Sequence, residues 1–266
     1  MKYTKLSRMK LFFILAALIF LFSIYREIIV NYLKFDVNAE DLMLRGIDGY
    51  ALRRELLISG LNLENAMFNF NTEKIIFFPI LILLCLKDYT DISKCFVKWN
   101  IGKNNKYFKE LFKCKLELGI MPVLAYLFCV IVAGVIAFCV GGLKIGTNYF
   151  GDFLISESFG ASLFNNSALA YGLLRVIINA LMIYINAYFA MSIYDFMHNY
   201  LRSGLLYLAF IIMLSVLLYD LNLFYLAPMT AYISFTYAYI YFYMLFTPLI
   251  TYGVCWLLMK VKKYEL

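Results

Sequence analysis

The sequence predicts an all-α membrane protein with six transmembrane helices. Of its 266 residues, 64% are hydrophobic and 15% are charged, whereas a soluble domain has about 45–50% apolar and about 25% charged residues. Apolar runs of roughly 20 residues, the length that crosses a bilayer as a helix, recur along the chain. A lysine-rich block, residues 87–117, separates the second run from the third, and the positive-inside rule places it in the cytoplasm.

The first span is predicted at about residues 11–30. The basic segment MKYTKLSRMK precedes it and holds the N-terminus inside. This start resembles a secretory signal, but no small-residue cleavage site follows the apolar run, so we expect a retained span. In the outside segment that follows, the stretch at residues 48–68 has Tyr50, Leu52, Leu56, Leu57 and Leu61 at mixed helical spacing, which predicts a short amphipathic helix on the outer surface.

The second span, about residues 67–86, has a short apolar core. The run IIFFPILILLCL covers only about 18 Å at 1.5 Å per residue, which is less than the roughly 30 Å of a bilayer core. The helix must therefore extend back toward Met67, through Glu73 and Lys74. Pro79 should kink it, and a kinked span with a polar half usually faces protein or water.

The remaining elements follow from the same patterns. We expect spans at about residues 118–141, 168–194, 204–220 and 235–259. Between the last two, residues 221–234 are apolar, too short to cross and broken by Pro228, which is typical of a re-entrant segment. Both termini are basic and are predicted inside. The whole chain, residues 1–266, then forms a single transmembrane domain.

Several function classes are unsupported by the sequence. It has no GxxxxGK[ST] loop, HExxH, CxxC or GxSxG motif, and only one histidine, so we expect no bound metal or other cofactor and no enzymatic activity of its own. No basic patch belongs to a folded nucleic-acid-binding module. The predicted spans also lack a confident acidic residue, which ion-coupled carriers usually place near the bilayer midplane. Energy for transport would then come from another subunit.

The lysine-rich block carries a family resemblance. Its run WNIGKNNKYFKELFKCKLELGI resembles the cytoplasmic loop between spans 2 and 3 of type-2 ABC exporter permeases, in which a basic, glycine-containing turn precedes an aromatic pair and a lysine. The six-span plan with both ends inside is similar as well. The matching positions are Gly102, Lys103, Lys106, Tyr107, Phe108 and Lys109.

The resemblance implies a permease subunit in the cell membrane that pairs with a second permease chain and with a separate ATP-binding cassette ATPase. In that family the loop docks into the ATPase, so Tyr107 and Phe108 would be hydrophobic anchors and the lysines would provide steering. Alternatively, the lysines only set topology and the aromatics lie at the headgroups. The cargo would be a peptide, a toxin, a lipid or a drug.

The fourth predicted span carries a polar stripe, Arg175, Asn179 and Asn186. We expect it to point into the bundle and to contribute to a translocation path. Alternatively, Arg175 snorkels to the headgroups or pairs with an acidic residue. His198 is expected at the surface, and Asp195 could cap its helix or pair with Arg202. A second function remains open, namely a membrane-embedded immunity or sensor protein that binds a partner without transport.

Overall fold

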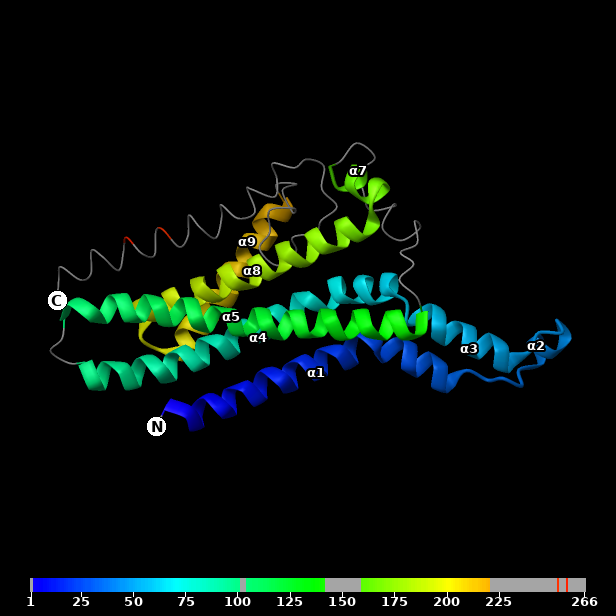
Figure 1. The fold of residues 1–266 in the computed structure, drawn as a ribbon, viewed down its shortest axis with the longest axis horizontal. Coiled ribbons are helices and arrows are strands. Elements are labelled where there is room, and N and C mark those ends of the chain that lie inside the picture. Colours follow the sequence, from blue (N-terminus) through cyan, green and yellow to red (C-terminus); the bar gives the residue numbers. More distant parts are fainter. Residues whose placement is uncertain (1, 101–103, 142–158, 221–252, 254–256, 258–266) are drawn as a thin grey trace.

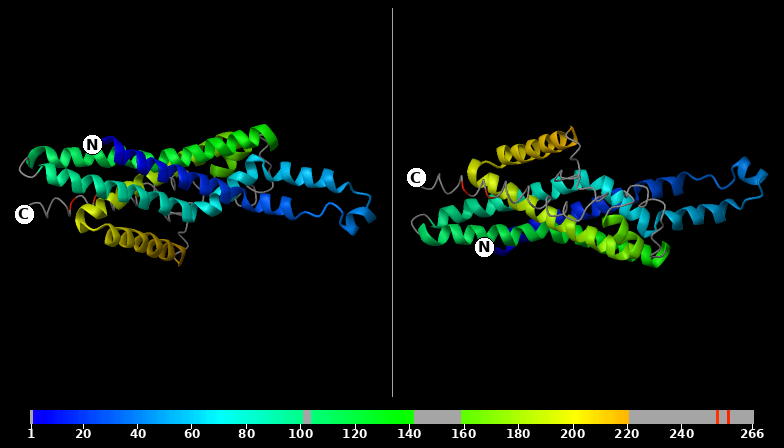
Figure 2. Two further views of the ribbon diagram at one scale, coloured as in Figure 1. Left: turned by 90° about the horizontal axis from the view of Figure 1, so that it is seen from below. Right: turned by 90° about the horizontal axis from the view of Figure 1, so that it is seen from above.

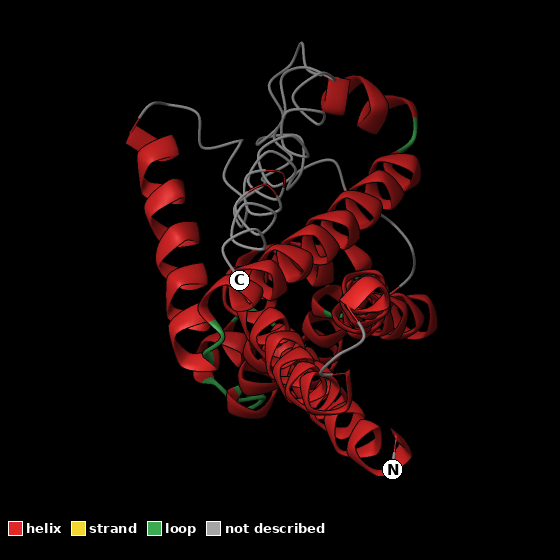
Figure 3. Ribbon diagram, turned by 90° about the vertical axis from the view of Figure 1, so that its left-hand side faces the viewer, coloured by secondary structure: helices red, strands yellow, loops and turns green. Residues whose placement is uncertain are grey.

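The computed structural model describes residues 2–100, 104–141, 159–220, 253 and 257, and within them it is helical, with no strand (Figure 3). The all-α class is therefore confirmed for this part of the chain. The elements are α1 (Lys2–Lys34), α2 (Glu40–Leu44), α3 (Gly49–Gly60), α4 (Leu63–Asn100), α5 (Asn104–Ile136), the π-helical turn η1 (Ala137–Gly141), α7 (Phe159–Asn166), α8 (Ala168–Met197) and α9 (Tyr200–Asp220).

Four long helices, α1, α4, α5 and α8, run side by side along the long axis of the molecule (Figure 1). α4 lies at the centre of this bundle, because it contacts α1, α5, α8 and α9. α9 packs on α8 and α4 and leans away from the bundle axis (Figure 2). The tight turn between α8 and α9, the last turns of α4 and the first turns of α5 lie at one end of the bundle, and α2, α3 and α7 lie toward the other (Figure 1).

Aromatic side chains fill the interior between α1, α4 and α5. Phe20 stacks on Phe77 with ring centroids 3.7 Å apart, and Phe70 and Phe78 both meet Tyr126 edge to face. In a bilayer the lipid tails are as apolar as these side chains, so helices associate through close packing instead of through burial from water. These interlocking rings therefore hold the three helices together through van der Waals contact.

Three helical segments are long and apolar enough to cross a membrane: Lys10–Lys34, Lys113–Val140 and Leu169–Met197. They coincide with the first, third and fourth predicted spans. Large apolar side chains such as Ile19, 69% exposed, cover their outer surfaces, as expected where lipid is the solvent. The chain is therefore a membrane protein.

The second, fifth and sixth predicted spans are not among these three segments. Residues 67–86 and 204–220 are helical, within α4 and α9, but neither helix is among the three segments apolar and long enough to span. The predicted sixth span and the re-entrant segment fall almost wholly outside the described residues. The six-span topology therefore stays a prediction.

The lysine-rich block has a different local structure from the loop predicted at residues 87–117. α4 continues to Asn100 and α5 begins at Asn104, so almost the whole block belongs to two long helices that form a hairpin (Figure 1). The reason is local: Lys87 pairs with Asp91 at 3.7 Å and Lys113 with Glu117 at 3.8 Å, both at the i,i+4 spacing that favours a helix. The block also lacks proline.

At the opposite end, the last turns of α1 and the antiparallel α3 extend past the bundle (Figure 2). We call residues 29–59 the arm. Asp48 caps α3 by accepting a hydrogen bond from the backbone N–H of Tyr50. Arg53 donates to the carbonyl of Tyr32 at 2.9 Å and stacks on its ring. The short helix predicted within residues 48–68 is therefore present as α3, and it packs on α1.

The turn of the arm depends on Gly49. A Cβ atom at this position would lie 2.1 Å from the carbonyl oxygen of Val37, so Gly49→Ala should force the segment before α3 away from the helix. We expect tryptic cleavage within the arm, at Arg45 and Arg53, to become several times faster. The matched control is Gly134→Ala, where a Cβ atom meets nothing within 4 Å. Equal cleavage rates for the two variants would contradict this packing.

Candidate functional site

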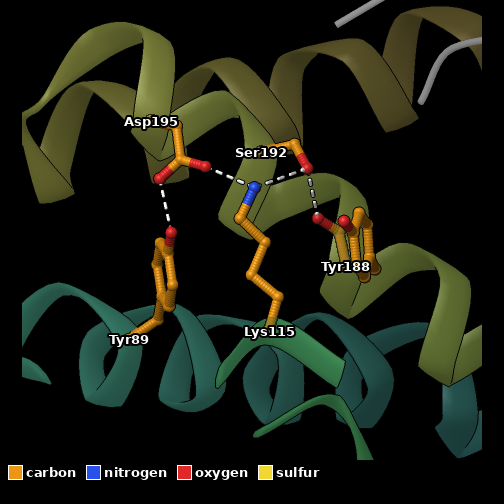
Figure 4. A network of polar contacts seen from close by, with 5 residues as sticks. All are labelled: Tyr89, Lys115, Tyr188, Ser192 and Asp195. Atoms are coloured by element: carbon orange, nitrogen blue, oxygen red, sulfur yellow. Dashed lines mark hydrogen bonds and ion pairs between the residues drawn. The ribbon is translucent and has the colours of Figure 1, made fainter. Parts of the chain in front are cut away.

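A buried ion pair joins α5 to α8 near the end of the bundle where the hairpin emerges. Lys115 of α5 contacts the carboxylate of Asp195 on α8, and Lys115 is only 3% exposed. The hydroxyl of Tyr89 on α4 donates to the other oxygen of this carboxylate at 2.5 Å. Figure 4 shows Asp195 between the lysine and the tyrosine, so three helices meet at one carboxylate.

Further groups enclose the ammonium group of Lys115. Lys115 donates to the hydroxyl of Ser192 at 3.4 Å, and Ser192 donates to the carbonyl of Tyr188 at 2.9 Å (Figure 4). The Lys115 nitrogen lies 5.4 Å from the ring centroid of Tyr188 and 5.9 Å from that of Tyr89, within the range of cation–π attraction. We call Tyr89, Lys115, Tyr188, Ser192 and Asp195 the Lys115 cluster.

The end of α8 explains why Asp195 needs this cation. α8 ends at Met197, and His198 adopts the left-handed conformation, with φ 54°, that terminates the helix. A carboxylate in the last turn of a helix is disfavoured by the helix dipole, so the charge of Lys115 offsets an unfavourable position. Asp195 does not pair with Arg202, as the sequence suggested it could; Arg202 is exposed and lies beyond the turn. His198 is exposed, as expected.

Lys115 does not stand out by composition, because it is one of eight lysines in the block. A signal was present in the spacing. The buried face of α5 runs through Leu118, Pro122, Ala125, Cys129 and Ala133, and Lys115 lies on this same stripe. Lys113 does not, and its side chain is 75% exposed. Helical periodicity would thus have separated a structural lysine from a surface one.

The polar stripe of α8 faces the interior of the bundle. Arg175 is 5% exposed and, with Asn179, lines a cavity of about 50 Å³ between α4, α5 and α8. The amide of Asn179 donates to the hydroxyl of Tyr126 at 3.3 Å, and that of Asn186 donates to the carbonyl of Met182 at 2.8 Å. The arginine is therefore enclosed by protein, and a snorkelling conformation is not adopted.

Four of the residues matched to the exporter loop, Lys106, Tyr107, Phe108 and Lys109, occupy the first turns of α5. Their side chains lie outside the described part of the structure, as do Gly102 and Lys103 altogether. In the part of the chain that the structure describes, no group of three or more histidine, cysteine or acidic side chains is arranged to hold a metal ion. The described site is therefore a set of ion pairs and hydrogen bonds.

Comparison with known proteins found no matching family model, curated protein or solved structure.

Removing one partner of the Lys115 ion pair should destabilise the protein strongly. Lys115→Met leaves the carboxylate of Asp195 buried without its cation, and removing one partner of a buried pair costs about 3–5 kcal/mol. We expect a clearly lower midpoint of thermal unfolding in detergent. Lys113→Met is the control, because its exposed pair with Glu117 is worth at most about 1 kcal/mol.

The double variant Lys115→Met/Asp195→Leu tests the pair itself. It removes both charges together, so it should regain most of the stability lost in Lys115→Met alone. A double variant that loses the sum of the two single losses would show that the two side chains act independently.

Proposed function

We propose that this chain is the permease subunit of a type-2 ABC exporter, driven by ATP that a separate subunit hydrolyses. The observation that supports the proposal best is the position of the Lys115 cluster at the base of the α4–α5 hairpin. The tip of this hairpin carries the residues that match the ATPase-docking loop of such permeases. One buried carboxylate then connects both helices of the hairpin to α8.

The hairpin is suited to passing a displacement into the bundle. From Lys109 to Lys115 the helix rises about 9 Å, with no break in α5 between them. A movement imposed on the tip would therefore reach Lys115 through a rigid element. Because Lys115 contacts Asp195 and Tyr89 donates to the same carboxylate, α8 and α4 would have to follow or the ion pair would separate.

In the complete transporter, two permease chains and two ATPase subunits would assemble in the cell membrane, each permease crossing it several times with the hairpin on the cytoplasmic side. The transport path would include the stripe Arg175, Asn179 and Asn186, which lies on the interior face of α8. Alternating access would follow from ATPase closure at the hairpins. The cargo class expected from the resemblance is a peptide, a toxin, a lipid or a drug.

Reversing the charge of the hairpin tip tests this proposal. In Lys103→Glu/Lys106→Glu/Lys109→Glu, a docking surface complementary to an acidic rim would become repulsive. We expect an ATPase subunit that co-purifies with the native chain to be lost, or its recovery to fall at least about tenfold. Tyr107→Ala/Phe108→Ala should have a similar effect by removing the hydrophobic anchors.

Lys34→Glu is the matched control, because Lys34 is an exposed lysine at the other end of the bundle. It should leave the recovery unchanged. Recovery of a non-hydrolysing partner that is unaffected by the tip substitutions would favour the immunity or sensor function instead.

A further inference from the structure

The cavity beside Arg175 has room for one small polar group. Its volume of about 50 Å³ compares with the roughly 10–15 Å³ of such space that a single water molecule needs. Its wall has one charged group, that of Arg175, and two neutral polar side chains. Besides Arg175, Asn179 and Tyr126, the lining is apolar and includes Met67, Phe70 and Ala133.

A second buried cation lies close by. Lys74 is only 1% exposed and follows the cavity residue Phe70 by one turn of α4. Lys74 and Arg175 both have interactions within the protein, so a guest in the cavity would add to contacts that these side chains already make. A negatively charged guest suits a cavity that has a cation in its wall.

The polar side chains of the lining are suited to a carboxylate. A guanidinium group has five N–H donors, so Arg175 can keep its contacts within the protein and still bind both oxygens of a carboxylate. Asn179 and Tyr126, which are hydrogen-bonded to each other at 3.3 Å, offer a further amide N–H and a hydroxyl. All three groups come from the interior faces of α5 and α8.

The rest of the lining is apolar, and this restricts what can carry the carboxylate. Aliphatic, aromatic and thioether side chains form the other walls. At the α4–α8 contact, Gly172 has no side chain, and a Cβ atom there would lie 3.3 Å from the terminal methyl group of Met67. Methionine repacks easily around a guest. We propose that the cavity binds the carboxylate end of an apolar chain, as found in a fatty acid or at the C-terminus of an apolar peptide.

Binding can be measured on the purified chain in detergent, without any ATPase, so this inference can fail or succeed independently of the proposed export function. Titration with palmitate, followed by native mass spectrometry, should show one saturable site. The alcohol and the trimethylammonium compound of the same alkyl length should bind at least about tenfold more weakly, because they lack the negative charge. Equal binding of all three compounds would overturn the proposal.

Two variants locate the site. Arg175→Gln should weaken palmitate binding by about tenfold to a hundredfold, the range expected for a charge-assisted bidentate contact. Ala133→Val keeps every charge and fills part of the cavity, so it should weaken binding as well while the protein elutes as a single folded species. Arg202→Gln and Val135→Leu, at exposed positions, should bind like the native chain. Unchanged affinity in either cavity variant would place palmitate elsewhere and contradict the proposal.

The two sources of a carboxylate can be distinguished in the same assay. An apolar peptide with a free C-terminus should bind and compete with palmitate, whereas its C-terminal amide should not. If neither palmitate nor the free-acid peptide binds, the cavity is not a carboxylate site.

Discussion

Burial of the Lys115 ammonium group is the constraint on which the arrangement of the bundle depends. A charged group taken out of water is costly unless it is paired and hydrogen-bonded, and here the partners come from α8 and α4. A helix shifted by one turn moves its side chains by about 5.4 Å, which would separate Lys115 from Asp195. The ion pair therefore fixes the relative heights of α4, α5 and α8, in a way that packing of apolar side chains alone would not.

Close packing, and not the ion pair, sets the distances between the helices. A Cβ atom at Gly119 of α5 would lie 3.1 Å from the ring of Tyr184 on α8, and one at Gly204 of α9 would lie 3.1 Å from a methyl group of Leu83 on α4. Small residues at helix interfaces allow this approach, which is the usual basis of association in lipid. Polar contacts therefore determine the register of neighbouring helices, and glycines determine how closely the helices approach each other.

The sequence predicted those features that depend on short stretches of chain. Apolar runs located three helices that can cross a membrane, because hydropathy and length are local properties. The short helix predicted within residues 48–68 depends on local apolar spacing as well. The two helices of the hairpin are harder to predict, because a run of lysines between apolar segments is also common in loops; i,i+4 pairs such as Lys113 with Glu117 are the local signal that favours a helix.

The Lys115 cluster could not be predicted in the same way, since 80 positions in the sequence separate Lys115 from Asp195 and no local pattern pairs them. Arg175 illustrates the same limit. Its place on a polar stripe predicted an interior position, but the cavity beside it also needs Ala133 of α5 and Leu63 of α4. Only the packing of the three helices brings these residues together.

α8 itself shows how a membrane protein can place charges inside a bundle. Arg175 and Asp195 are 20 residues apart, about 30 Å along a helix, which is the thickness of the hydrocarbon core. Both charges can therefore lie near the two faces of the bilayer while the segment between them stays uncharged. The buried amide of Asn186 lies between them and bonds to its own helix at Met182, so it needs no partner on another helix.

α4 also carries charged side chains inside the bundle, but along its middle and not only near its ends. It carries Lys74 and Asp88 inside the bundle, both almost inaccessible, and it is not among the helices apolar enough to face lipid. Such a helix is stable at membrane depth only where protein covers it, and α4 is the helix that contacts α1, α5, α8 and α9. Its central position is thus a consequence of its polarity. The three more apolar helices, α1, α5 and α8, cover its buried charged side chains, while over residues 75–86 α4 exposes only apolar ones, namely Ile75, Ile76 and Ile80.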